Sequence, residues 1–572
     1  MNRNVESHFA ELPQVDFQRS IFDRSSTHKT SLNVGELVPF YVDEVLPGDS
    51  FKITTSKVMR LQTLLTPVMD NLYADFYWFY CPDLILWEHT KQFFGENTES
   101  AWAPTVEYQI PSISSPEGGF DSGTIADYFG LPVGVEWNAS DKHAPSALPF
   151  RAYGMICDQF FRDQNVTDPL YIPTGDANQT GSNGSNYIYD VANGGKPFKV
   201  SRYHDYFSSC LPSAQKAVNN VTVPLPEFPG GNFAVHTGVN NTTEEIYNNY
   251  PLTYYSRTWN STSEEFTDFS SLPQPQNTKL LYTNPNYYPA MGTAVGLENS
   301  SRYVWPANLS IDIPETSIGS FSINDLRLAF ALQRYFERNA RSGSRYQEYL
   351  LAQYGVHSPD ATLYKPQYLG GNRVPITIHE VLNNAQSEQD FLGDLGAMSV
   401  TADVHEDVVQ SFTMHGYIIG LVCVRYDNTY TQGLERFWSR KRTTDFYTPV
   451  FANLGEQPVM SCEIYADSNT LNNDDVFGYQ EAWADYRYKP SRCSGEMRPG
   501  ISNTLASWHF ADYYTEQPTL SDEWMRVDKT NVDRALAVSS SVSNQVFADI
   551  YVQNYCTRCM PVYSIPGLID HN

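Results

Sequence analysis

The first residues with types suited to chemistry are Gly48, Asp49 and Ser50, because some esterases hold a nucleophilic serine in this local sequence. A serine nucleophile also needs a positioned histidine and an oxyanion hole. Here the motif follows Pro47 between two expected strands, where proline, glycine and aspartate ordinarily form a turn. We therefore interpret it as a turn. The enzymatic alternative predicts an esterase activity that Ser50→Ala abolishes.

Two other groups have the spacing of metal ligands. Cys556 and Cys559 form the chain's one Cys-x-x-Cys motif, and a zinc site needs a second pair of ligands. Asp403, His405 and Asp407 alternate along an expected strand, so that their side chains share one face and could hold a divalent ion. An exposed strand edge explains the second group more simply, and thiols near the end of a strand explain the first. We expect no metal, cofactor or catalytic residue.

A basic and aromatic segment covers residues 435–442. Cations beside aromatic rings suit single-stranded nucleic acid, since cations contact phosphates and rings stack on bases. The candidate residues for contact with a packaged strand are Arg436, Trp438, Arg440, Lys441 and Arg442. The alternative is a cluster of salt bridges between subunits, because the chain offers many acidic partners.

Composition and charge exclude several classes of protein. The 572 residues include 38 basic and 65 acidic side chains, for a formal net charge of -27, which repels phosphate and argues against DNA binding by the whole surface. No apolar run approaches the ~18 residues of a membrane span, and no signal peptide is apparent, so we expect synthesis in a cytoplasm without membrane insertion. The eight cysteines are expected to be reduced and mostly buried.

Strand patterns dominate the chain. Residues 36–45 and 50–53 flank the turn at Pro47, and residues 72–81 carry bulky aromatics on both faces, which implies cover on both sides. Further expected strands are 416–425, 459–465 and 546–552. Strands at both ends of the chain predict an all-β sandwich whose sheets are completed by the C-terminal region.

Helical and irregular segments interrupt this pattern. A short amphipathic helix is expected at 151–162, a longer helix with one broad apolar face from 322 to Gly343, and a further helix from 346 to Gly355. The sequence suggests four parts: an extended N-terminal arm that lies on neighbouring subunits (1–34), the first part of the core (35–216), an outward insertion with short strands of its own (217–316), and a helical insertion with the rest of the core (317–572).

Many segments in order along the chain resemble the major capsid protein of the Microviridae, small icosahedral single-stranded DNA phages, and in particular its gokushovirus branch. The residues that carry this resemblance lie at 28–31, 35–50, 66–71, 72–82, 209–216, 326–346, 355–361, 368–372, 415–422, 437–440, 454–457, 476–480 and 485–490. Only residues 217–316 lack it.

The resemblance implies an eight-stranded antiparallel viral jelly roll with long loop and helical insertions. It implies self-assembly through fivefold, threefold and twofold contacts into a T=1 icosahedral capsid around circular single-stranded DNA. Further implied partners are a small basic DNA-binding protein and a host surface receptor, which the insertion would meet near the threefold axes. The virion would be assembled in the cytoplasm of a bacterial host. The alternative from another class is a β-sandwich phage spike that binds carbohydrate or a receptor.

Overall fold

A computed structural model describes most of the 572 residues. The described residues are 18–97, 106–216, 235–237, 254–260, 265–266, 302–306, 309–311, 323–343, 345–356, 365–382, 395–468 and 470–563. The chain divides into two compact units, of which the first comprises residues 1–217 and 336–572 and the second comprises residues 218–335.

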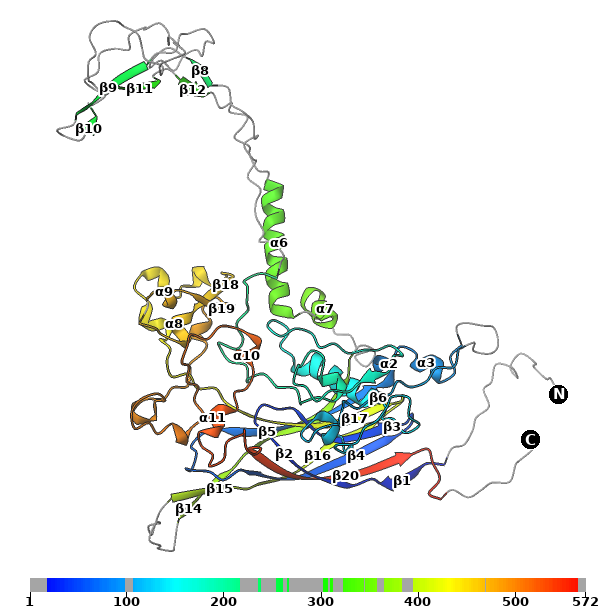
Figure 1. The fold of residues 1–572 in the computed structure, drawn as a ribbon. Coiled ribbons are helices and arrows are strands. Elements are labelled where there is room, and N and C mark those ends of the chain that lie inside the picture. The colour runs from blue at the N-terminus through cyan, green and yellow to red at the C-terminus, as the bar shows by residue number, and fades with distance from the viewer. Residues whose placement is uncertain are drawn as a thin grey trace. The chain divides into compact units, whose positions relative to one another are not determined.

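An antiparallel five-stranded sheet joins the two ends of the chain. Its strands are β1 (Ser20–Asp23), β2 (Ser26–Leu32), β4 (Ser50–Leu61), β16 (Thr401–Ser411) and β20 (Val546–Arg558). Strand β20 pairs with β4 on one side and with both β1 and β2 on the other, so the red C-terminal strand lies among blue N-terminal strands (Figure 1). The predicted completion of a sheet by residues 546–552 is confirmed.

A four-stranded antiparallel sheet has the order β13-β5-β17-β3. The bounds of its strands are Gln367–Pro375 for β13, Leu72–Pro82 for β5, Gly416–Tyr426 for β17 and Val38–Val45 for β3. Strand β5 is buried on both faces, as its aromatic sequence predicted. Gly48 has φ +90° in the turn between β3 and β4, a conformation that glycine adopts without strain, and the predicted turn there is confirmed.

The two sheets share one hydrophobic core, as in a β-sandwich. Alternate residues of β4 and β20 are buried, including Phe51 and Ile550, and they belong to the same cluster as Trp78 of β5. Phe412 follows β16 and packs against Phe51 at 5.7 Å and against Tyr80 of β5 at 4.5 Å between ring centroids. Aromatic burial on this scale is a major stabilising term of the fold.

The predicted N-terminal arm is partly wrong. Residues 20–32 form β1 and β2 within the five-stranded sheet of the same chain, and Leu32 is fully buried. Arg24 also donates to the Asp43 carboxylate of β3 at 2.9 Å. The polar sequence of β2 fits an edge strand with one solvated face, and this is why it lacked an apolar period. Residues 1–17 of the predicted arm lie outside the described residues.

Helix α5 (Leu148–Ile156) packs against strands β5 and β17 of the four-stranded sheet, and the other two predicted helices lie further along the chain. Helix α5 continues into a π-helical turn, η1 (Cys157–Phe161), where Phe160 packs on Phe79 of β5 with ring centroids 4.7 Å apart. Helices α6 (Ile323–Ser342) and α7 (Tyr346–Tyr354) follow the predicted bounds, and α7 ends at Gly355 with φ +67°. All three helical predictions are confirmed.

The remaining elements of the first unit are short. They are α2 (Asp83–Leu86), α3 (Thr90–Phe93), β6 (Ile113–Ser114), α4 (Ile125–Tyr128), β7 (Gln179–Thr180), η2 (Val191–Asn193), β14 (Ile378–Leu382), β15 (Leu395–Ser399), η6 (Arg436–Ser439), η7 (Thr443–Asp445), η8 (Pro449–Phe451), β18 (Glu456–Met460), α8 (Ser461–Ile464), α9 (Thr470–Asn473), β19 (Val476–Glu481), η9 (Ala484–Tyr486), η10 (Gly495–Met497), η11 (Ala506–Trp508), α10 (Asp522–Met525) and α11 (Thr530–Asp533). The strand predicted at 459–465 stops at Met460, because the Glu463 carboxylate accepts from the Met460 N–H at 3.0 Å and starts α8.

The second unit contains short strands that pair with one another. They are β8 (Val235–Thr237), β9 (Tyr254–Asn260), β10 (Glu265–Phe266), β11 (Arg302–Pro306) and β12 (Leu309–Ile311). Strand β9 pairs with β10 and β11, and β8 pairs with β12. This unit contains nearly all of the predicted insertion, but its boundary falls at residue 335, within α6, rather than at 316.

Asp75 of β5 is a buried carboxylate held by two cations. It accepts from Arg425 at 2.6 Å, from Arg373 at 2.7 Å and from the Tyr203 hydroxyl at 2.8 Å. Burial alone would raise the pKa of Asp75, but these cations and hydrogen bonds lower it below its ordinary value. The carboxylate therefore stays charged and joins β5, β13 and β17 to residue 203.

Candidate assembly and nucleic-acid surface

The predicted basic segment lies in the connection from β17 to β18, where η6, η7 and η8 follow one another. None of the residues in these three turns is buried. The Asp445 carboxylate accepts from the backbone N–H groups of Lys441 at 2.9 Å and Arg442 at 2.8 Å. These bonds lower the pKa of Asp445 and fix the turn that presents both basic side chains.

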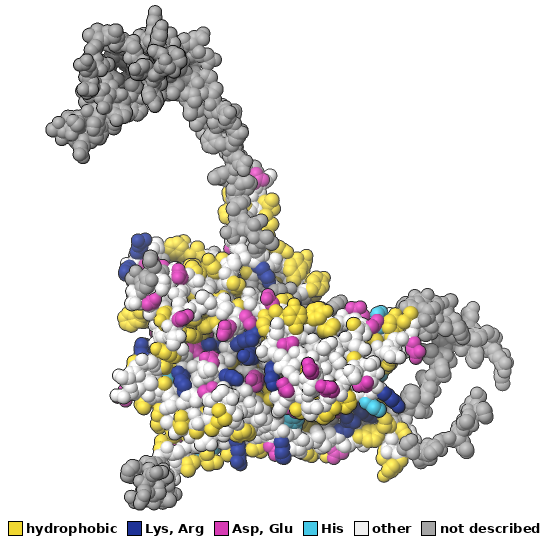
Figure 2. Space-filling model, viewed as in Figure 1, with side chains coloured by type: hydrophobic (Ala, Val, Ile, Leu, Met, Phe, Trp, Pro, Cys, Tyr) yellow, Lys and Arg dark blue, Asp and Glu magenta, His cyan; other side chains and the backbone are white. Residues whose placement is uncertain are grey.

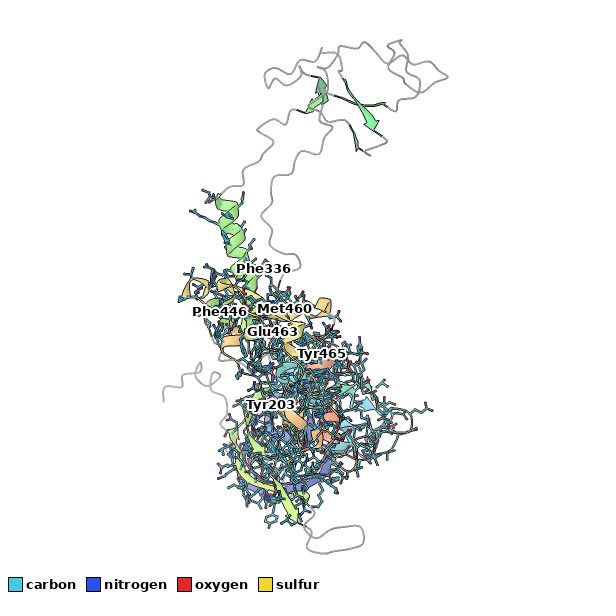
Figure 3. The ribbon with its side chains drawn as sticks, turned by 90° about the vertical axis from the view of Figure 1, so that its left-hand side faces the viewer. Tyr203, Phe336, Phe446, Met460, Glu463 and Tyr465 are labelled. Carbon is cyan, nitrogen blue, oxygen red and sulfur yellow. The ribbon has the colours of Figure 1, made fainter. Side chains whose placement is uncertain are left out.

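Arg436 forms an ion pair within the subunit. Its guanidinium donates to the Glu463 carboxylate at 2.6 Å, and the Tyr206 hydroxyl donates to the other oxygen of Glu463 at 3.0 Å. Burial would lower the pKa of Arg436, but Glu463 raises it above its ordinary value. Figure 3 marks Glu463, Met460 and Phe446 in this region.

Arg440 also forms an ion pair within the subunit. Only 7% of its side-chain surface is exposed, its guanidinium forms an ion pair with Asp485, and it stacks on the Tyr486 ring at 4.1 Å. A cation held by a carboxylate and a ring has little capacity left for phosphate. The salt-bridge alternative thus applies to Arg436 and Arg440, although the pairs form within one chain and not between subunits.

The other three candidate residues face solvent. Trp438 exposes 66% of its surface and lies against Phe437, with ring centroids 4.6 Å apart. Lys441 and Arg442 are also exposed. The structure therefore separates the five candidates into two bracing arginines and three accessible side chains.

Large apolar side chains gather on the same connection. The Tyr486 hydroxyl of η9 accepts from the Tyr447 N–H of this connection at 3.2 Å, so Tyr486 adjoins it. The exposed side chains on the connection, together with Tyr486, are called the 434–454 surface: Leu434, Phe437, Trp438, Phe446, Tyr447, Val450, Leu454 and Tyr486. Val450 is the most exposed of them at 88%. Exposed apolar groups are ordinary when scattered, but seven along one connection, with Tyr486 beside them, are typical of a surface that a partner covers.

A pocket of about 420 Å³ adjoins this surface. Its lining combines Tyr206, Phe437, Tyr486 and Tyr488 with both ion pairs, those of Arg436 and Arg440. On the face shown in Figure 2, basic and acidic side chains are interspersed. The pocket lining carries four cations and three carboxylates, most of them in ion pairs with one another, beside its aromatic walls.

The other chemical motifs have structural roles. Asp49 is buried in the turn after β3, where its carboxylate accepts from Arg558 at 2.9 Å, and the Ser50 hydroxyl shares a hydrogen bond with Ser411 at 2.7 Å. All eight cysteines are free thiols, and five of them are buried, in agreement with the expectation. Cys556 is buried in β20, whereas Cys559 beyond the strand is exposed.

The Asp403, His405 and Asp407 motif lies on β16, where Asp407 is buried, Asp403 is half-buried and His405 is exposed. A bulge in β16 follows Glu406, and the Asp407 carboxylate bonds to Thr55 and, at 2.9 Å, to His405. Asp403 forms an ion pair with Lys57 at 3.2 Å. Within the described part of the chain, no three His, Cys, Asp or Glu side chains are grouped as a metal site.

Sequence reasoning missed Lys57. Its position among the inward residues of β4, with Ile53, Thr55 and Met59, was the available signal, because a lysine that alternates in phase with core residues must be buried. Among the described ranges, no helix is long and apolar enough to cross a membrane.

Comparisons with known proteins define the class. Residues 10–568 match the family model described as Capsid protein (F protein). The chain is 36% identical over 599 residues to Capsid protein VP1 of Chlamydia phage 1, covering 99% of this chain and 98% of that one. It is 36% identical over 565 residues to Capsid protein VP1 of Spiroplasma virus 4, covering 95% and 94%. The corresponding protein of Bdellovibrio phage phiMH2K is 32% identical over 569 residues, covering 99% and 98%.

The chain belongs to the capsid protein (F protein) family of bacteriophages. Within it, the relatives identify a major capsid protein of the Microviridae that resembles those of gokushoviruses, which confirms the resemblance seen in the sequence. A structural role in the virion through oligomeric assembly follows from this membership, and the spike alternative finds no support in it.

Proposed function

We propose that this chain is the repeating subunit of a T=1 icosahedral shell that encloses a circular single-stranded DNA genome and assembles in a bacterial cytoplasm. In this proposal the sandwich is an eight-stranded jelly roll, with β1 and β2 together serving as one edge strand. The observation that carries the proposal is the 434–454 surface on a chain of the capsid family. Closed symmetry buries such surfaces in every copy.

The 434–454 surface supplies the kind of contact that a shell needs. A stable interface buries about 800 Å² on each partner, and exposed aromatic side chains supply a large share of such areas at small entropic cost. Trp438, Phe446 and Val450 project from short turns that the Asp445 hydrogen bonds and the Arg440 ion pair hold in place. The surface is thus ordered before a neighbouring subunit covers it.

The test is to express the chain alone, measure particle mass by sedimentation and image the heaviest fraction by negative stain. Closed shells support a self-sufficient subunit. Trimers or pentamers that close only with added DNA or a small basic protein support a shell that needs partners. A monomer under all of these conditions contradicts the proposal.

DNA contact is assigned to the accessible part of the basic segment. Trp438 would stack on a base, and Lys441 and Arg442 would contact phosphates, while Arg436 and Arg440 brace the turns behind them. With a net charge of -27, the shell cannot neutralise a genome by itself, and a separate small basic protein would supply the missing cations.

Host attachment is assigned to the insertion at 217–316. That segment lies almost wholly within a separate compact unit with its own strand pairs, which supports a role independent of the shell. Replacing it with a short linker should leave particle mass unchanged and abolish adsorption to host cells. Retained infectivity would rule out this assignment.

A further inference from the structure

Lys57 is a lysine buried between the two sheets. Only 1% of its side-chain surface is exposed, and its Nζ lies 4.2 Å from the centroid of the Phe76 ring. Lys57 comes from β4 of the five-stranded sheet and Phe76 from β5 of the four-stranded sheet. A lysine here cannot extend its amine to water and must find its partners in the core.

Those partners are one amide and one carboxylate that also contact each other. The Lys57 Nζ donates to Asn372 Oδ1 and, at 3.2 Å, to Asp403 Oδ2. The Asn372 Nδ2 donates to the same Asp403 oxygen at 2.8 Å. Asn372 lies on β13, opposite Phe76 in the register, so the triad spans both sheets.

We propose that Lys57 and Asn372 form an intramolecular isopeptide bond, with Asp403 as the catalytic proton carrier. The Lys57 Nζ attacks Asn372 Cγ, a new C–N bond forms, and the bond from Cγ to Nδ2 breaks. The lysine ammonium and the primary amide become a secondary amide and an ammonium ion. Atoms and charge balance, and no oxidant, reductant or further reactant is needed.

The geometry suits each step. Hydrogen bonding to Oδ1 holds Nζ next to the carbonyl group of Asn372, and a side-chain rotation would bring it to the distance of about 3–3.5 Å from Cγ at which attack proceeds. The single oxygen Asp403 Oδ2 contacts both the nucleophile and the departing nitrogen, so it can take a proton from Nζ and return it to Nδ2. No water is required to carry that proton.

Burial makes the Lys57 ammonium easier to deprotonate, although the contacts with Asn372 and Lys57 lower the pKa of Asp403 and favour the ion pair before reaction. Burial lowers the pKa of Lys57, and the opposing charges of Asp407 and Asp403 do not restore it to its ordinary value. Asp407 is itself hydrogen-bonded to Thr55 and His405, which keeps it from replacing Asp403 at Nζ. The desolvated amine thus meets the condition under which lysines act as nucleophiles.

The first test is the intact mass of the full chain, purified from assembled or soluble protein and denatured before measurement. We expect the sequence mass, corrected for any loss of the first methionine, minus one ammonia. The full sequence mass in wild-type protein overturns the proposal, and this measurement depends on no variant.

Peptide mapping locates the bond. Trypsin cannot cleave after an acylated Lys57, so digestion should give a branched peptide in which residues 53–60 are joined to residues 346–373. Loss of ammonia with separate, linear peptides would instead mean a succinimide elsewhere and would overturn the proposal.

Variants identify the roles. Lys57→Met, which fills the same space, and Asn372→Ala should each show the full mass of their own sequence. Asp403→Asn keeps the shape but removes the proton carrier, and it should reduce the cross-linked fraction at least tenfold. Lys52→Arg is the matched control, because Lys52 is an exposed residue of the same strand and its variant should still lose ammonia. An unchanged cross-linked fraction in Asp403→Asn overturns the role of Asp403.

Discussion

Removing Lys441 and Arg442 should change the salt dependence of DNA binding by an amount that the structure fixes. Each phosphate contact with single-stranded DNA contributes about 0.7 to the slope of log affinity against log salt. Because Arg436 and Arg440 are held by Glu463 and Asp485, only two cations of the segment are available. The double variant Lys441→Ala/Arg442→Ala should therefore lower the slope by about 1.4, the contribution of two phosphate contacts.

The assay is fluorescence anisotropy of a labelled single-stranded oligonucleotide over a series of salt concentrations, starting at low salt because the chain is acidic. Lys91→Ala/Lys142→Ala is the matched control, since it removes two exposed cations far along the sequence and alters net charge equally. The stability of the test variant should stay within about 0.5 kcal/mol of wild type, as for other exposed side chains.

Arg440→Ala provides the contrasting result. It leaves Asp485 without its guanidinium in a mostly buried site, so it should cost about 3–5 kcal/mol of stability while leaving the salt slope unchanged. A slope that falls for Arg440→Ala, or that does not fall for the Lys441 and Arg442 double variant, would refute the division of the segment into bracing and contacting residues.

Three further outcomes are expected. Val450→Asp should leave the melting temperature unchanged but raise the critical concentration for assembly more than tenfold, because burying a valine contributes about 1.5 kcal/mol or more per contact. Light scattering measures that concentration, and an unchanged value would contradict the prediction. Asp75→Asn should destabilise the chain by about 3–5 kcal/mol at pH 7. The folded pKa of Asp75 is depressed, so the stability that its charge contributes is present above the unfolded pKa of about 3.9 and is lost as pH falls through the folded pKa. The difference in melting temperature between wild type and Asp75→Asn should therefore vanish in acid. A difference that stays constant with pH would argue against this role of Asp75. Deleting residues 1–34 should unfold the sheet edge and lower the melting temperature, whereas deleting 1–17 should not; equal effects would show that β2 is dispensable.

Local patterns predicted much of this fold. The turn at Gly48, the doubly buried β5 and helices α6 and α7 each follow from residues close together in sequence. Strands β1 and β2 escaped prediction because a polar edge strand is specified by its partner, and that partner is β20, more than five hundred residues away.

The sequence predicted where the candidate site lies, but not which of its cations form ion pairs within the chain and which are exposed. The type and spacing of residues 436–442 identified an unusual segment, yet nothing local shows that Arg436 and Arg440 are paired while Lys441 is exposed. Their partners, Glu463 and Asp485, lie 27 and 45 positions further on and reach them only through the fold. Long-range pairing of this kind has no local sequence signal.

Strand β20 lies between β4 and the two N-terminal strands, so the five-stranded sheet can be completed only near the end of protein synthesis. Roughly 480 residues separate β4 from β20, so at about 5–20 residues per second the ribosome needs on the order of half a minute or longer to deliver the missing strand. Until then β4 has an open edge, and the nascent chain cannot close its sandwich. Only finished polypeptides can therefore become building blocks, which keeps truncated products out of the particle and makes the growing chain a natural client of chaperones.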